Sequence, residues 1–173
     1  MYALQDYIGE DSINVALQRF LDDWAFREGL YPTTEDLIGY LRDVTPDSLQ
    51  YLITDMWETI TLYENRVKEA SYQKKSENEY LVKLDLSTIK YRADSLGNET
   101  PISFEDWIDV GVYGETESGK DTLLYLEKHL FNQEETQLEI RVAQEPTKAG
   151  VDPIFKQIDR NTGDNVKTVT EEG

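Results

Sequence analysis

The sequence predicts an α+β protein in which a helical segment precedes an antiparallel β-sandwich and an irregular C-terminal tail. In the first third of the chain, apolar residues recur every three or four positions, as on one face of a helix. From Arg66 the apolar period changes to two, as in strands of a sheet that is wet on one face. After Pro146 neither period persists. We therefore expect a helical segment at residues 1–64, a sandwich at 65–145 and a tail at 146–173.

The first two helices are predicted from their stop and cap residues. Residues 2–9 have a helical pattern with no cap ahead of them, and Gly9 is a suitable stop. A helix already in progress at the start leads us to expect that this chain is part of a longer one. Asp11 or Ser12 is the expected N-cap of the second helix, which carries a wide apolar stripe of Ile13, Ala16, Leu17, Phe20, Leu21 and Trp24.

A third helix is predicted after Pro32, because Thr33 and Asp36 have the spacing of a capping box. This short helix is expected to end near Val44. Helices of this length joined by short turns pack as antiparallel neighbours. The first region is thus predicted to be an antiparallel helical segment.

The stretch Thr45–Tyr63 is predicted to be a fourth helix that connects the two halves. Thr45 is the expected N-cap, and Pro46 stands at the first helical position, where its missing N–H costs nothing. Because strand patterns follow at once, this helix should pack against the sandwich. The contacts are expected to come from Met56, Trp57 and Ile60.

Short strands separated by turns predict a sandwich of the immunoglobulin-like kind. The segment KKSENE (74–79) is an expected hairpin turn. Ile89 and Tyr91 have the opposite parity to the apolar residues before them, so a bulge is expected near Thr88. The expected strands are 67–72, 82–86, 107–113, 122–131 and 138–142.

The tail is expected to be irregular and rich in turns. Val151, Ile154, Phe155 and Ile158 could anchor it to the body of the protein through apolar contacts. The final eight residues or so are expected to be mobile.

Charge and composition restrict the classes of partner. The 173 residues carry 35 acidic and 17 basic side chains, a net charge of −18. Such acidity argues against nucleic acids and anionic membrane surfaces as partners. It suits either a solvated acidic face or a docking face for a basic partner or a cationic substrate. The chain has no cysteine, which excludes disulfides and thiolate metal sites. No apolar run is long enough for a membrane span, and the compartment stays open.

Catalytic chemistry has few candidate residues. A zincin site needs two histidines one helical turn apart, and this chain has one, His129, on an expected strand. Asp55, Glu58 and Glu64 could divide acid and base work, although a solvated set on a helix surface is the simpler interpretation. Tryptophan and tyrosine rings could line a carbohydrate face, although most have core parity.

A calcium loop is suggested, and then contradicted, by the residues near the end of the chain. Asp159, Asn161, Gly163 and Asp164 resemble the start of such a loop. The sixth position is Asp164 where glycine is needed, and the twelfth is Thr170 where glutamate is needed. No catalytic, cofactor-binding or metal-binding residue is therefore assigned in this chain.

Four stretches carry a resemblance to a known family. They are MYALQDYIGEDSINVALQRFLDDWAF, YPTTEDLIGYL, DSLQYLITDMWETITLYENR, and FEDWIDVGVYG taken with AGVDPIFKQIDRNTGDN. Their order resembles the C-terminal part of the alanyl aminopeptidase (gluzincin) family of zinc metallopeptidases, particularly a bacterial, membrane-anchored branch. The resemblance spans nearly the whole chain.

The resemblance implies a non-catalytic role for this chain within a larger enzyme. The zinc ligands, the substrate-amine motif and the transition-state tyrosine of the family would precede Met1, and Tyr2 and Tyr7 are not assigned the tyrosine's role. Zinc and a peptide substrate are expected for the parent protein, with this chain supporting the upstream zinc domain and walling its cleft. The alternative is a free-standing acidic module that binds a protein or a glycan.

Overall fold

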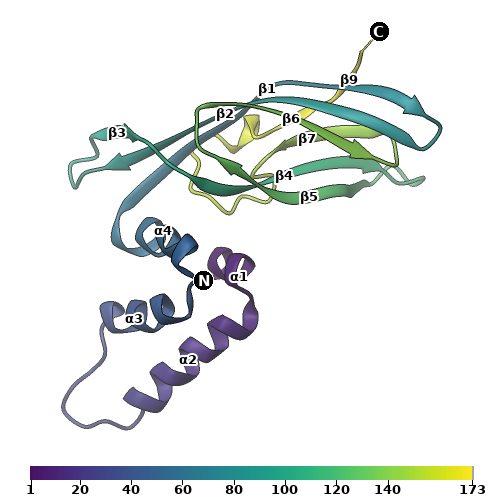
Figure 1. The fold of residues 1–173 in the computed structure, drawn as a ribbon. Coiled ribbons are helices and arrows are strands. Elements are labelled where there is room, and N and C mark those ends of the chain that lie inside the picture. The colour runs from purple at the N-terminus through teal and green to yellow at the C-terminus, as the bar shows by residue number, and fades with distance from the viewer. Residues whose placement is uncertain (173) are drawn as a thin grey trace. The chain divides into compact units, whose positions relative to one another are not determined.

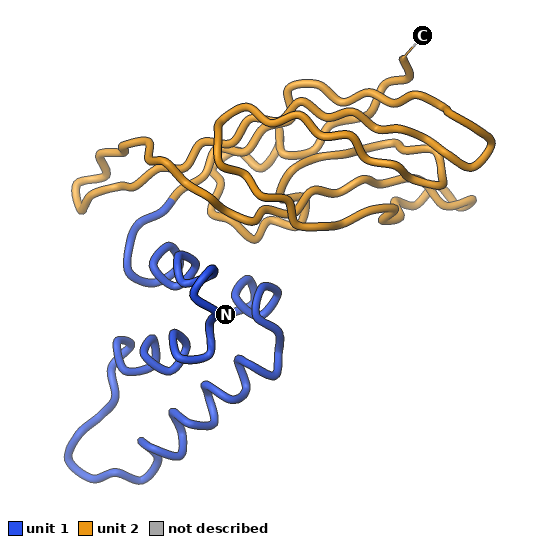
Figure 2. Tube along the Cα trace, in the orientation of Figure 1, with its two compact units in different colours: residues 1–61 blue, residues 62–173 orange. Residues whose placement is uncertain are grey.

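The computed structural model describes residues 1–172 and confirms an α+β protein. Within these residues the chain has four α-helices and two sheets that are mostly antiparallel. It divides into two compact units, Met1–Thr61 and Leu62–Gly173 (Figure 2). We call them the helical unit and the β unit. None of the described helices is long and apolar enough to cross a membrane.

The helical unit is built around one small core. Its elements are α1 (Tyr2–Ile8), α2 (Glu10–Trp24), α3 (Thr34–Val44), a 3-10 turn (Asp47–Leu49), α4 (Gln50–Ile53) and a π-helical turn (Thr54–Glu58). The predicted capping box at α3 is present, with the Thr33 N–H donating to Asp36 Oδ2 at 2.7 Å. The buried apolar side chains are Leu4, Ile13, Ala16, Ile38, Leu41, Leu52 and Ile53.

The second helix begins earlier than predicted. Gly9, with φ of 85°, ends α1 and directly precedes Glu10, the first residue of α2. Glycine adopts this positive φ without steric cost, so the chain can turn within one residue. Asp11 and Ser12, the predicted caps, therefore lie inside the helix.

The predicted connecting helix Thr45–Tyr63 is wrong at both ends. Thr45 closes α3, because its Oγ1 donates to the Leu41 carbonyl at 2.7 Å. At the other end, helical structure stops at Glu58, and Ile60 begins strand β1. Ile60 and Tyr63 continue a helical stripe, but the run ITLY also suits a strand, and a short apolar run cannot separate the two.

The three side chains expected to contact the sandwich can each be described within their own part of the chain. Met56 and Trp57 pack against the core of the helical unit. Ile60, the first residue of β1, is 52% exposed. Their contact with the sandwich stays a prediction.

The β unit contains two sheets (Figure 1). The first has the order β3-β2-β1-β9, with β6 also paired to β2, and the second has the order β5-β4-β7-β8. β2 pairs antiparallel with β3 and β6, β4 pairs antiparallel with β5 and β7, and β7 pairs antiparallel with β8. β1 and β9 are parallel, with Ser71 opposite Thr170. The strands are β1 (Ile60–Ser76), β2 (Glu79–Ala93), β3 (Glu99–Ile102), β4 (Asp106–Glu115), β5 (Asp121–Phe131), β6 (Glu135–Val142), β7 (Pro146–Val151), β8 (Val166–Thr168) and β9 (Thr170–Glu171).

Both sheets contribute to a single hydrophobic core. Along β2, alternate residues from Tyr80 to Leu86 are buried in it, as the period of two requires. The fully buried side chains from the first sheet include Val67, Val82 and Leu84, and those from the second include Val110, Val151 and Phe131.

The change of parity expected near Thr88 does not occur, because the even-numbered residues of β2 stay buried through Lys90. The parity of apolar residues misled the prediction because this end of the β unit is polar inside. Lys90 Nζ contacts Asp106 Oδ2 at 2.7 Å, and both side chains are buried.

The prediction of an irregular tail is wrong, because β7, β8 and β9 add strands to both sheets. Strand β7 was not predicted because it contains small residues. A side chain at Gly150 would overlap the carbonyl oxygen of Asn165, so the sequence PTKAGV lacks a clear apolar alternation. The final residues through 172 include two of these strands, and residue 173 lies outside the described residues.

The predicted apolar anchors of the tail are confirmed only in part. Val151 is fully buried in the core and Ile154 is half-buried, whereas Phe155 and Ile158 are exposed. The fully buried Asn65 instead donates from its backbone N–H to Asp159 Oδ2 at 2.8 Å and from its side chain to Gln157 Oε1 at 2.8 Å. Buried amides need hydrogen-bond partners, and residues 157–159 supply those of Asn65 on β1.

Candidate functional site

The single histidine has a local partner on its own strand. His129 lies on β5, and its Nε2 is 2.8 Å from the hydroxyl of Tyr125. Burial lowers the pKa of His129 below its ordinary value, which favours the neutral ring at pH 7. This geometry accounts for the residue as part of the strand surface.

Each of the three candidate carboxylates has a partner of its own. Asp55 is buried, and Thr61 Oγ1 lies 3.4 Å from its Oδ1. Glu58 pairs with Arg42 at 2.6 Å. The hydrogen bond from Arg42, followed in size by that from Thr54, lowers the pKa of Glu58. Glu64 lies on β1 and pairs with Arg66 at 2.9 Å. A carboxylate already held by arginine is a poor general base.

The residues that resemble a calcium loop form a turn held by hydrogen bonds within it and to β1. Asp159 accepts from the N–H of Asn161 at 2.9 Å, and Asp164 accepts from the Asn161 side chain at 2.9 Å and from Arg66 on β1 at 3.1 Å. Thr170 belongs to β9. Among residues 1–172, no group of three or more His, Cys, Asp or Glu side chains is arranged to hold a metal ion.

The aromatic side chains are divided between core and surface. Tyr63, Tyr72 and Tyr80 are buried in the β unit, whereas Trp107 is partly exposed. The structure therefore does not gather these rings into one carbohydrate-binding face.

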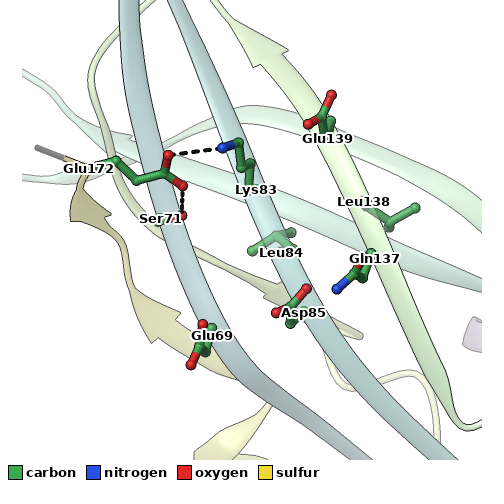
Figure 3. A pocket seen from close by; sticks show the side chains of 9 residues that line it. All are labelled: Glu69, Ser71, Lys83, Leu84, Asp85, Gln137, Leu138, Glu139 and Glu172. Atoms are coloured by element: carbon green, nitrogen blue, oxygen red, sulfur yellow. Dashed lines mark hydrogen bonds and ion pairs between the residues drawn. The ribbon is translucent and has the colours of Figure 1, made fainter.

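An acidic groove on the first sheet is a candidate binding site. It has a volume of about 430 Å³ and lies over β1, β2 and β6 (Figure 3). The β2–β6 register places Lys83 opposite Glu139 and Asp85 opposite Gln137. Most of its polar side chains come from the strand positions that alternate with core residues. The lining residues are Glu69, Ser71, Lys83, Leu84, Asp85, Gln137, Leu138, Glu139 and Glu172.

Glu172 closes one end of this acidic groove. Its carboxylate accepts from Ser71 Oγ at 2.6 Å and from Lys83 Nζ at 2.9 Å (Figure 3). It also accepts from the side-chain amide of Gln73. These hydrogen bonds, that of Ser71 first, lower the pKa of Glu172 to about 2. Glu172 is therefore ionised at physiological pH and neutralises Lys83, the single basic residue of the lining.

The remaining charge of the acidic groove is negative. With Lys83 and Glu172 offset, the carboxylates of Glu69, Asp85 and Glu139 are left, with the amide of Gln137 between strands. Such a surface attracts ammonium or guanidinium groups. The arrangement therefore suits the binding of a cationic group.

Sequence reasoning missed this groove for an identifiable reason. The alternation of Lys83 and Asp85 with buried leucines is visible in the sequence and predicts a wet strand face. The pairing of β2 with β6, and the approach of Glu172 to Ser71, join segments far apart in the chain. Nothing local encodes those contacts.

Comparisons with known proteins leave the chain without a family assignment. No protein-family model matches the sequence, and no curated protein matches it at the level that indicates common ancestry.

Proposed function

We propose that this chain is a non-catalytic C-terminal part of a zinc aminopeptidase-like metallopeptidase. In this proposal the helices are the antiparallel end of the catalytic domain, and the two sheets are an immunoglobulin-like β-sandwich. The chain supports the zinc domain and walls the cleft in which that domain hydrolyses peptides. Zinc belongs to the parent protein and not to this chain.

The observation that carries this proposal is the incomplete burial of the helical unit. Its surface exposes Met1, Tyr2, Val15, Leu21, Phe26, Leu30 and Tyr31. Phe26 is fully exposed. A unit of about 60 residues buries only about 60% of its unfolded surface, so each large apolar side chain left in water removes a sizeable part of its hydrophobic stabilisation. Exposed apolar side chains in such a unit support the idea that another protein surface covers them.

The first test is the coding sequence upstream of Met1, which should contain an HExxH pattern in the same frame. The full protein should bind zinc and hydrolyse aminoacyl reporter substrates. Residues 1–173 alone should do neither after repurification. Stoichiometric zinc on the isolated chain, or hydrolysis that survives repurification, would contradict the proposal.

A matched pair of variants tests the exposed surface itself. Phe26→Asp and Tyr31→Asp should weaken binding of this chain to a separately produced zinc domain. Leu96→Asp alters an equally exposed apolar residue in a turn of the β unit and should leave binding unchanged. Equal binding by all three variants would show that this surface is not the one covered.

The acidic groove favours a second candidate, a free-standing module that binds a basic protein segment. A lysine-rich peptide should bind with an affinity that falls as salt rises, because exposed charges are screened. Asp85→Asn with Glu139→Gln should weaken that binding, whereas Glu117→Gln, in the exposed turn after β4, should not. Binding that is insensitive to salt and to these changes would remove this candidate.

A further inference from the structure

A buried cluster of charges lies beneath residues 152–157, on the face of β4 that points away from the hydrophobic core. Ile108 and Val110 face the core, so Asp109 between them points to the opposite side. The 152–157 segment covers that side closely, since a Cβ added at Gly111 would lie 2.8 Å from Pro153 Cγ. Asp109 is consequently 3% exposed.

Two lysines contact the two oxygens of Asp109. Lys156 Nζ lies 2.7 Å from Oδ2, and the Lys156 side chain is 2% exposed. Lys128 Nζ reaches Oδ1 at 2.9 Å from the neighbouring strand β5 and keeps more contact with solvent. The Lys156 amine and the Asp109 carboxyl are therefore held in contact in a site that excludes most water.

A second carboxyl group, that of Asp152, belongs to the same cluster. Asp152 is almost fully buried, and its oxygens accept from the backbone N–H groups of Lys156 at 2.9 Å and Gln157 at 3.0 Å. Its own N–H donates to the Asp109 carbonyl at 2.7 Å. Burial, with a contribution from the charge of Asp109, raises the pKa of Asp152 to about 6. Asp152 can thus hold or release a proton near neutral pH.

We propose that Lys156 and Asp109 are the site of a self-formed amide cross-link, with Asp152 as the proton-transfer group. Proton transfer within the buried pair gives a neutral amine and a neutral carboxylic acid. The Nζ lone pair attacks Cγ of Asp109 to form the C–N bond. Asp152 accepts a proton from Nζ and delivers it to the departing hydroxyl, so one water leaves and Asp152 ends as it began. No oxidant, metal or cofactor takes part in this balance.

Two physical arguments favour the reaction at this position. Groups held in contact react as if at very high concentration, since the entropy cost of bringing them together has already been met. A buried ion pair also carries a large desolvation cost, which Asp109 and Lys156 no longer carry once they become one neutral amide. Lys128 then loses its carboxylate partner but is 25% exposed and keeps its contact with solvent.

Lys90 and Asp106 provide an internal comparison. Their contact is also 2.7 Å and also buried, but the third group on the same Asp106 oxygen is the hydroxyl of Tyr63, at 2.9 Å. A phenol has an ordinary pKa near 10 and is a poor proton carrier at neutral pH. We therefore expect the Lys90–Asp106 pair to remain ionic.

Intact-mass spectrometry of the denatured full chain tests the cross-link. Wild-type protein should be lighter than its sequence by one water molecule. Proteolysis should yield a branched peptide that joins the segments containing Asp109 and Lys156. Lys156→Arg keeps the charge but cannot form this amide, and Asp152→Asn removes the proton carrier with little change in size. Both variants should have the full sequence mass, and Lys90→Arg should still be lighter by one water.

The outcomes separate cleanly. Folded wild-type protein, checked by circular dichroism, that keeps its full mass after days at pH 6 to 7 would overturn the proposal. A lost water that maps to another pair, or that persists in Lys156→Arg, would overturn it as well. Loss of the cross-link in a folded Asp152→Asn variant would establish the role of Asp152. Its retention there would remove that role.

Discussion

The helical unit and the β unit bury their side chains in different ways. The helical unit has a small core and leaves several large apolar residues exposed, Phe26 and Tyr31 among them. The β unit fills the space between its sheets and also buries charged groups, each with a partner of opposite charge or a hydrogen-bond donor. The stability of the helical unit is thus limited by the size of its core, whereas the stability of the β unit also depends on the pairing of its buried polar groups.

The largest effect is expected from the matched pair Phe131→Ala and Phe26→Ala. Phe131 is fully buried in the β unit, so its truncation leaves a cavity and should cost about 3–5 kcal/mol of unfolding free energy. Phe26 is fully exposed in the helical unit and should change stability by less than about 0.5 kcal/mol in this chain. Urea unfolding of both variants measures the difference. A comparable loss for Phe26→Ala would mean that the apolar surface is already covered.

The two units should differ in how their stability depends on pH, because they hold carboxyl groups with pKa values shifted in opposite directions. The pKa of Asp152 rises from 3.8 to about 6 on folding, so the folded β unit favours the protonated acid. Stability should therefore fall as pH rises from about 4 to about 6, by roughly 3 kcal/mol at most. In the helical unit, Arg42 lowers the pKa of Glu58 below 4.5, so its contribution is lost only as pH falls below that value.

Hydrogen exchange measured peptide by peptide between pH 4 and 8, with intrinsic exchange rates corrected for pH, reports on each unit separately. The experiment belongs on a Lys156→Arg background, in which the proposed amide cannot form. There, the further change Asp152→Asn should remove the fall in protection of residues 152–157. The same fall in both proteins would assign it to another group.

How much of this could be predicted from the sequence depends on how local each signal is. The capping box at Thr33 and the stop at Gly9 were predictable because they involve residues near one another in the chain. The strand character of Ile60–Tyr63 was not, since a short apolar run suits either period. Strand β7 was missed because its small residues reflect a close approach by Asn165, a contact that only the folded chain creates.

The candidate sites show the same limit. Lys156, Asp109 and Asp152 have no telling spacing in the sequence, and their cluster depends on the tail crossing β4. The acidic groove likewise needs Glu172 to reach β1 and β2. By contrast, the chemistry that the sequence argued against, a histidine-based zinc site or a calcium loop, was judged from residue types and spacing alone. Composition restricts chemistry early, and topology decides which residues meet.

The smallest expected effects on unfolding free energy come from two glycine-to-alanine substitutions, which should have opposite signs in the two units. Gly150→Ala should destabilise the β unit by about 1–3 kcal/mol, because the added methyl group would overlap the backbone carbonyl of Asn165, which cannot rotate away. Gly39→Ala lies inside α3, where the same methyl group meets open space. It should stabilise the helical unit by about 0.5–1 kcal/mol, since alanine is the better helix former. Thermal unfolding of the two variants measures both shifts. If Gly39→Ala were destabilising, something would have to occupy the space that the described chain leaves open at this position of α3. The helical unit would then be packed as tightly at Gly39 as the β unit is at Gly150.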